Sequence, residues 1–328
     1  MAAERLQWKA PPKQTGECVV AGLPALGALA DAEIAVREAR EIGHAATLMY
    51  ALSHGAFARY QCGNYASANA VFDELAALAE EKGTLFWKAF GIMNQGCVRA
   101  LTGQPSDAIR MITSGWQSTG ATMWMPFFLS YLARAHAELG KFEDAWCSIG
   151  EAMKTVETSK ERWCEAEVHR TAGEITLLVP EPNAARAKAF FERALAVARA
   201  QRAKSWELRA AMSMARLWCA QNKKDDARNL LAPIYGWFSE GFATLDLKEA
   251  KAFSTSSRHH RMLTRPQLPP GLLHDRDRLA INTATIPIRK MPSKVPAPPI
   301  EPTGAPSPRM LPRLSRSAPI SVPRLPPT

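Results

Sequence analysis

A glycine followed five residues later by an alanine recurs along this chain of 328 residues. Two more alanines, Ala187 and Ala227, stand at the same place in the pattern without the glycine. They follow turns at 180–183 and 222–224. The six alanines are 36, 40, 37, 42 and 40 residues apart, and such a period indicates an array of helical repeats. The four glycine–alanine pairs are Gly27/Ala32, Gly63/Ala68, Gly103/Ala108 and Gly140/Ala145.

Two further sets of residues recur at fixed positions relative to these turns and alanines. Small residues stand seven positions before the turns: Ala56, Gly96, Ala133, Gly173 and Ala215. Apolar residues stand four positions after the alanines: Val36, Phe72, Ile112, Ile149, Phe191 and Leu231. Small residues let two helices approach closely, and we expect the apolar residue to fill the space against the next unit. An irregular helical bundle is the alternative.

Each unit is therefore predicted to contain a helix A, a turn and a helix B. We expect A helices at 45–61, 84–102, 122–139, 160–178 and 203–221. We expect B helices at 29–42, 65–82, 105–117, 142–157, 184–201 and 225–240. The predicted fold is an all-α solenoid of five to six units over 29–252. Residues 1–28 are expected to be irregular, so the first B helix has no predicted A partner.

The turn pattern Gly-x-[Phe/Tyr]-x-x-Ala, seen from Gly63 and from Gly140, resembles tetratricopeptide (TPR) repeats, although the period exceeds the usual 34 residues. The segments 41–65, 118–146, 157–175 and 230–252 resemble the C-terminal repeat region of bacterial proteins that also carry adenylate/guanylate cyclase and AAA ATPase domains. None of the catalytic parts is covered. The resemblance implies a regulatory module in signal transduction.

Residues 253–328 differ sharply in composition. They hold 12 Lys and Arg against 3 Asp and Glu, a charge of +9 out of the chain's +10, and 16 of its 24 prolines. We expect this basic, proline-rich tail to be disordered. Its PxxP matches, at 296–299 and 323–326, are common in such segments. Frame-shifted translation at 1–28 and 253–328 is a competing interpretation, which would make the chain a fragment of a larger cyclase or ATPase protein.

The chain shows no Gly-x-x-x-x-Gly-Lys-[Ser/Thr] loop and no dinucleotide fingerprint, so we expect no enzyme activity and no cofactor. The six cysteines lack metal-ligand spacing, and His169 lacks an HExxH context, so no metal site is predicted. Widely spaced thiols and the lack of a signal peptide favour a cytoplasmic protein. No membrane partner is expected, and nucleic acid only as weak binding by the tail.

In TPR-like arrays the A helices line a concave groove, so the resemblance also places candidate binding residues. We expect the aromatic residues to hold an apolar anchor of a peptide, and the arginines to bind its carboxylates. The alternative is that the arginines pair with Glu167, Glu174 and Glu207 of neighbouring helical turns. The candidates are Tyr50, Phe57, Phe90, Phe127, Arg134, Arg170, Arg209 and Arg216.

These features predict a non-catalytic scaffold or regulatory module that binds a protein or peptide in this groove. Self-association through the ends of the array is a further expectation. The alternative function is a small-molecule sensor detached from a cyclase or ATPase. The partner's identity does not follow from the sequence.

Overall fold

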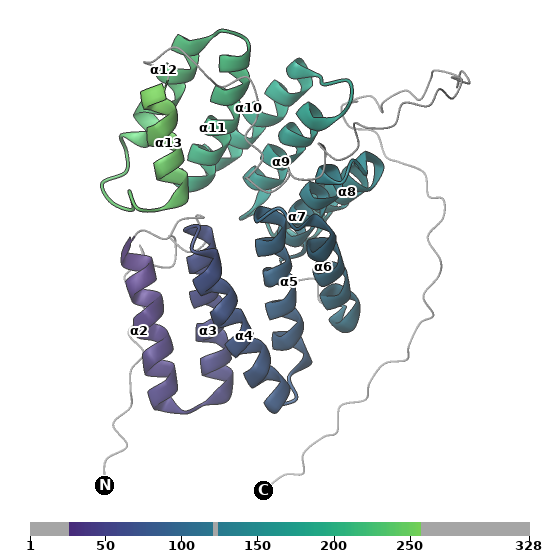
Figure 1. Ribbon diagram of the computed structural model, residues 1–328, viewed down its shortest axis with the longest axis vertical. Coiled ribbons are helices and arrows are strands. Elements are labelled where there is room, and N and C mark those ends of the chain that lie inside the picture. The colour runs from purple at the N-terminus through teal and green to yellow at the C-terminus, as the bar shows by residue number, and fades with distance from the viewer. Residues whose placement is uncertain (1–25, 121–123, 257–328) are drawn as a thin grey trace, which may run out of the picture. The chain divides into compact units, whose positions relative to one another are not determined.

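The computed structural model describes residues 26–120 and 124–256, which form twelve α-helices and no strand (Figure 1). All twelve lie in one compact unit. The A helices are α3 (Ala45–Gln61), α5 (Leu85–Leu101), α7 (Met125–Glu138), α9 (Glu165–Leu178), α11 (Lys204–Ala220) and α13 (Leu245–Ser256). The B helices are α2 (Leu26–Ile42), α4 (Tyr65–Glu81), α6 (Pro105–Thr119), α8 (Phe142–Ser159), α10 (Ala184–Ala200) and α12 (Lys224–Tyr235).

The predicted all-α repeat fold is confirmed, and each helix expected from the repeat is present. Two bounds were wrong by about five residues. α9 begins at Glu165 rather than near 160. α12 ends at Tyr235 rather than near 240, because Pro233 interrupts its last turn and Gly236 follows. One helix, α13, was not predicted as a separate element. The expected irregular start and disordered tail lie almost entirely outside the described residues. None of the described helices has the length and apolar character needed to cross a membrane.

Four of the five turns from an A helix to the following B helix share one backbone geometry. Gly63 has φ +84°, and the N–H of Asn64 donates to the carbonyl oxygen of Arg59 at 2.9 Å. This six-residue closure is the Schellman motif, which needs a residue in the left-handed region. The same closure follows α5, α7 and α11, and in the last turn Asn222 takes the glycine's place with φ +62°. Asparagine tolerates that conformation better than other non-glycine residues, which explains why the pattern survives there.

Small and apolar residues meet inside each unit. A Cβ placed on Gly96 of α5 would lie only 2.8 Å from Cγ1 of Ile112 in α6. A Cβ on Gly173 of α9 would likewise lie 2.7 Å from Cδ1 of Phe191 in α10. In these two units the apolar residue therefore packs against helix A of its own unit. The expected contact with the next unit stays a prediction. Ala32, which no described A helix precedes, is only half-buried.

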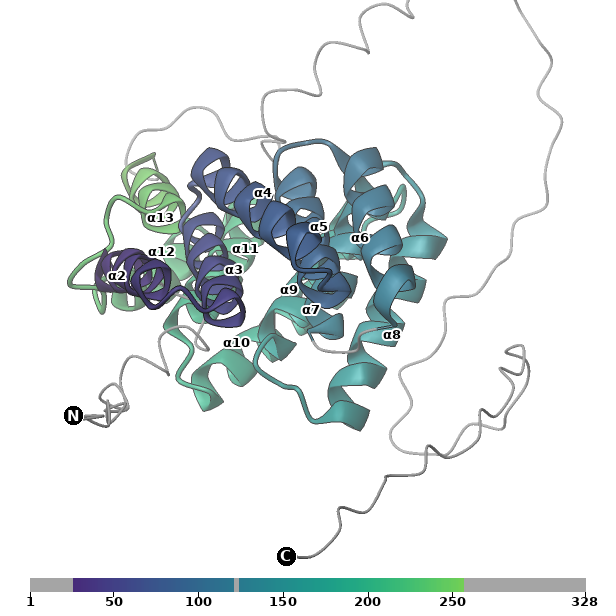
Figure 2. The same ribbon diagram turned by 90° about the horizontal axis from the view of Figure 1, so that it is seen from below.

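The last helix also touches the first described A helix. The backbone N–H of Leu245, at the start of α13, donates to the carbonyl oxygen of Cys62 at 3.2 Å. A Cβ on Gly63 would lie 2.6 Å from Cβ of Leu245, so only glycine fits there without a shift. Figures 1 and 2 both show α13 close to α3. This contact brings side chains of α3, α11 and α13 together.

Candidate functional site

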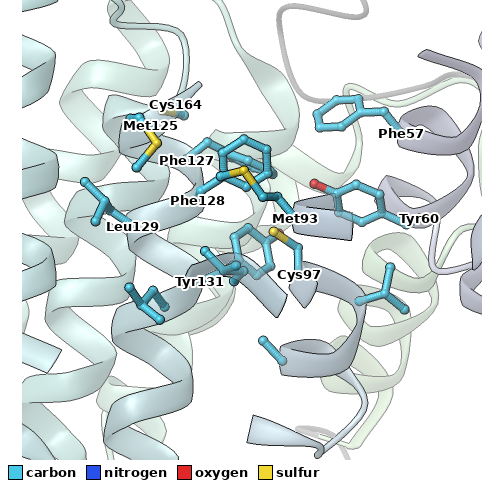
Figure 3. Packing of buried hydrophobic residues seen from close by; sticks show 14 of the residues in the cluster. Phe57, Tyr60, Met93, Cys97, Met125, Phe127, Phe128, Leu129, Tyr131 and Cys164 are labelled. Atoms are coloured by element: carbon cyan, nitrogen blue, oxygen red, sulfur yellow. The ribbon is translucent and has the colours of Figure 1, made fainter. Parts of the chain in front are cut away.

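Three of the four predicted aromatic residues are buried. Phe57, Phe90 and Phe127 are 3%, 5% and 0% exposed. The ring centroid of Phe127 lies 5.7 Å from that of Phe57 and 5.0 Å from that of Trp163. In Figure 3, Phe57 and Tyr60 of α3 are directed toward the side chains of α5 and α7. These rings belong to the hydrophobic core, where the sequence led us to expect the lining of an open groove.

Tyr50, the fourth aromatic, is 58% exposed. Its ring centroid lies 4.1 Å from that of His54 and 6.3 Å from that of Trp87, which it meets edge-on. Leu85 and Phe86 are also exposed beside Trp87. We call these five residues the aromatic edge. They lie toward the N-terminal ends of α3 and α5 and give the described surface a cluster of apolar groups.

Arg170 of α9 is held by two carboxylates of its own helix. Its Nε donates to Oε2 of Glu167 at 2.7 Å and its Nη1 donates to Glu174. Burial opposes the ionised form of Glu167, but nearby guanidinium groups, chiefly that of Arg170, outweigh it and lower the pKa of Glu167. The pKa of Glu174 is lowered in the same way. Ser213 of α11 donates to Glu174 at 2.9 Å, which links α9 to α11.

Arg134 of α7 pairs with the last residue of its helix. Its Nε donates to Oε1 of Glu138 at 3.0 Å. The other oxygen, Oε2, is buried and has no hydrogen-bond partner among the described residues. Burial raises the pKa of Glu138, and Arg134 offsets this only in part. Arg134 also acts electrostatically on Glu174, so it belongs to the same group of charges as Arg170.

Arg209 of α11 joins three helices. Its Nε donates to Oδ2 of Asp246 in α13 at 2.7 Å. Its Nη1 and Nη2 donate to Oε1 and to the backbone oxygen of Gln61 in α3, at 3.0 and 3.2 Å. The guanidinium also lies over the ring of Trp206, 5.0 Å from its centroid. Burial disfavours the charge, but Asp246, together with Glu167 and Tyr131, outweighs it and raises the pKa of Arg209.

Arg216, two turns further along α11, is the most accessible of the four arginines. Its Nη2 donates to Oε2 of Glu249 at 2.9 Å, and both side chains are about half exposed. Glu249, like Asp246, belongs to α13. The last helix therefore supplies the carboxylates for both arginines of α11.

The structure brings the predicted arginines together on neighbouring A helices, and each has a carboxylate partner within the chain. Glu167 and Glu174 pair with Arg170, as the alternative reading had it, whereas Glu207 binds Arg199 and Lys204 instead. We call this group the charged row. Its members are Arg134, Glu138, Glu167, Arg170, Glu174, Arg209, Arg216, Asp246 and Glu249.

Asp246 and Glu249 were missed by the sequence analysis. Their segment, LDLKEAKAF, carries the signal that would have found them: acidic residues three apart beside apolar residues three apart. Gln61 was missed as well, and no local pattern marks it.

His169 of α9 lies beside an acidic residue of its own helix. Its Nε2 lies 3.9 Å from Oε1 of Glu165, and burial lowers its pKa to about 4. The imidazole is therefore neutral near pH 7. Within the described ranges no group of three or more His, Cys, Asp or Glu is placed to hold a metal ion.

No family model and no curated protein matches this chain. Among solved structures, the crystal structure of BtubC (BKLC) from P. vanneervenii is similar, with 17% sequence identity and a TM-score of 0.45. That match covers 74% of this chain and 95% of the BtubC chain.

Proposed function

We propose that this chain is a non-catalytic module that binds a protein or peptide partner through the A-helix side chains of its charged row. The observation that supports this most is the pairing of Arg209 and Arg216 with carboxylates of another helix, α13. Arginines on one helix that hold acidic residues of a second helix form a surface chemistry suited to an acidic peptide. The aromatic edge would supply a second, apolar contact.

The wider setting follows from the sequence resemblance alone. A cytoplasmic TPR-like module related to the repeat region of cyclase and ATPase proteins would regulate a bacterial signalling system by recruiting a partner. Its array of repeated helices would present several contact positions along one face.

A peptide-display selection on the immobilised full chain tests this function. We expect enriched peptides to be rich in Asp and Glu and to bind about tenfold more weakly to Arg216→Glu, because a favourable charge pair becomes repulsive. Arg228→Glu is the matched control, since Arg228 is an equally exposed arginine whose carboxylate partner among the described residues, Asp225, belongs to its own helix, α12. Selection without enrichment, or binding equal in both variants, would contradict the proposal.

A small-molecule sensor remains the second candidate, and one observation favours it. Trp206 Nε1 and Ser205 Oγ are buried and have no hydrogen-bond partner among the described residues. Buried donors of this kind usually have a water or ligand partner. A thermal-shift screen of polar metabolites tests the idea, since a specific ligand raises the melting temperature by an amount that grows with the logarithm of its concentration relative to Kd. Loss of that shift in Trp206→Phe would support it, and a screen without hits would oppose it.

A further inference from the structure

Helix α13 differs from the other A helices in what supports it. It packs against α11 and α12, and no B helix follows it among the described residues. Its buried residues are Leu247, Ala250 and Phe253, spaced three apart on one face. This face anchors the helix through only two large side chains. An isolated helix of twelve residues is marginal in water, so α13 depends on this contact to stay folded.

The neighbouring face of α13 carries its two paired carboxylates. Asp246 binds Arg209 where both side chains are more than four-fifths buried, and Glu249 binds Arg216 nearer the solvent. The first residue of the helix is held by the carbonyl oxygen of Cys62. α13 is thus bound by two arginines, an apolar contact and one backbone acceptor, as a short helical ligand would be.

We propose that α13 is an internal occupant of a peptide site, and that the partner is an amphipathic helical segment that displaces it. The proposal rests on the proposed function and names the partner's chemistry. The partner presents two acidic residues three apart, each followed by an apolar residue, as in Asp246-Leu247 and Glu249-Ala250. The acidic pair meets Arg209 and Arg216, and the apolar residues take the places of Leu247, Ala250 and Phe253.

Competition from α13 sets the affinity for such a partner. A tethered segment is present at millimolar effective concentration, so a free peptide of equal intrinsic affinity is strongly disfavoured. Weakening α13 raises the fraction of molecules with an open site, and the apparent Kd falls in proportion.

The experiment measures binding of a fluorescein-labelled peptide with the sequence of residues 240–256 to the full chain by fluorescence anisotropy. We expect weak binding to the wild type. We expect binding about threefold tighter to Glu249→Gln, which removes an exposed pair, and about tenfold tighter or more to Asp246→Asn/Glu249→Gln, which also removes the buried pair. The single variant alters a half-exposed residue and should keep the fold, so the prediction stands even if the double variant unfolds.

A charge reversal shows whether the peptide binds in the place of α13. The variant Arg216→Glu/Glu249→Gln should lose the wild-type peptide and bind a peptide in which Glu249 is replaced by Lys. A purely structural role for α13 predicts no such exchange of specificity. The matched control is a peptide that carries both Asp246→Asn and Glu249→Gln. It should bind neither the wild-type chain nor its variants.

Three outcomes overturn the proposal. If neither variant binds the peptide more tightly than the wild type, α13 is only a capping helix. If the peptide binds more tightly but its specificity does not change in the charge-reversal variant, the peptide binds elsewhere. If the double variant forms a dimer by light scattering and takes up no peptide, the occupant is a second copy of the chain. In each of these cases the proposed function is still supported if peptides from the display selection bind more weakly to Arg216→Glu than to the wild type.

Discussion

Arg209 of α11 and Gln61 of α3 are 148 positions apart in the sequence, yet Nη1 of the arginine lies 3.0 Å from Oε1 of the glutamine. The same guanidinium binds Asp246 of α13. One side chain thus connects the first described A helix with the last two. The predictions below test this connection, the packing of the repeat and the burial of the inner side chains.

Replacing Arg209 should destabilise the chain substantially. Arg209→Gln leaves the carboxylate of Asp246 without its partner, and that carboxylate is 18% exposed. We expect a loss of about 2–4 kcal/mol in the free energy of unfolding, measured by urea denaturation followed by circular dichroism. Arg228→Gln removes an exposed pair and should cost about 0–0.5 kcal/mol. Equal losses in the two variants would show that Arg209 does not connect the helices.

The small residue of helix A should contribute to stability where it contacts the apolar residue of helix B. In Gly173→Ala the new methyl group collides with the ring of Phe191, which is itself fully buried. We expect a loss of about 1–3 kcal/mol in unfolding free energy. In Gly150→Ala the new methyl group meets nothing within 4 Å, and this variant should gain about 0.5–1 kcal/mol because alanine favours the helix. Thermal denaturation of both variants checks the prediction, and a stabilised Gly173→Ala would refute it.

The inner aromatic residues should behave as core residues. Phe127→Ala removes a fully buried ring from contact with Phe57 and Trp163, and we expect a loss of about 3–5 kcal/mol in unfolding free energy. Tyr50→Ala changes an exposed ring and should cost about 0.5 kcal/mol or less. The comparison needs only denaturant titrations of two variants. A small effect for Phe127→Ala would restore the open groove expected from the sequence.

Stability should fall in mild acid partly because of His169. Burial lowers its pKa to about 4 in the folded chain, while Glu165 opposes and Arg193 reinforces the shift. The unfolded chain has the ordinary value near 6.5, so it takes up a proton first as the pH falls. The stabilising contribution is therefore complete above pH 6.5 and is lost as the pH approaches 4. For this residue we expect a loss of about 2 kcal/mol between pH 7 and pH 5.

His169→Gln isolates that contribution, because glutamine does not titrate. The variant should show a smaller fall in unfolding free energy between pH 7 and pH 5 than the wild type, by the amount given above. Urea titrations at the two pH values measure it. Identical pH dependence in the two proteins would mean that His169 is protonated equally in both states.

The repeat could be predicted from the sequence because its determinants are local. Gly140 lies in a turn and Ala145 in the first turn of the helix that follows, five residues later, and Gly173 and Phe191 belong to consecutive helices. The burial of Phe57 could not be predicted, since it depends on Phe127 and Trp163, which are 70 and 106 positions further along. Concave positions were identified from the repeat register, but the register does not tell which of them other helices cover.

For the arginines too, the partners close in the sequence could be predicted and the distant ones could not. Pairing of Arg170 with Glu167 and Glu174 follows from helical spacing and was one of the two readings weighed. The partners of Arg209 and Arg216 lie on α13, and this helix was not recognised because the composition changes within it, at residue 253. With α13 in place, Asp246 and Glu249 pair with the two arginines for which the sequence predicted the carboxylates of a peptide.

Hydrogen exchange of the full chain with and without a bound acidic helical peptide tests the central claim most directly. Peptide fragments that cover residues 245–256 report on α13, and fragments of α9 provide the internal reference. The account predicts that the bound peptide lowers protection of α13, because the helix is displaced and unfolds, while α9 keeps its protection. Unchanged or increased protection of α13 in the saturated complex would contradict it.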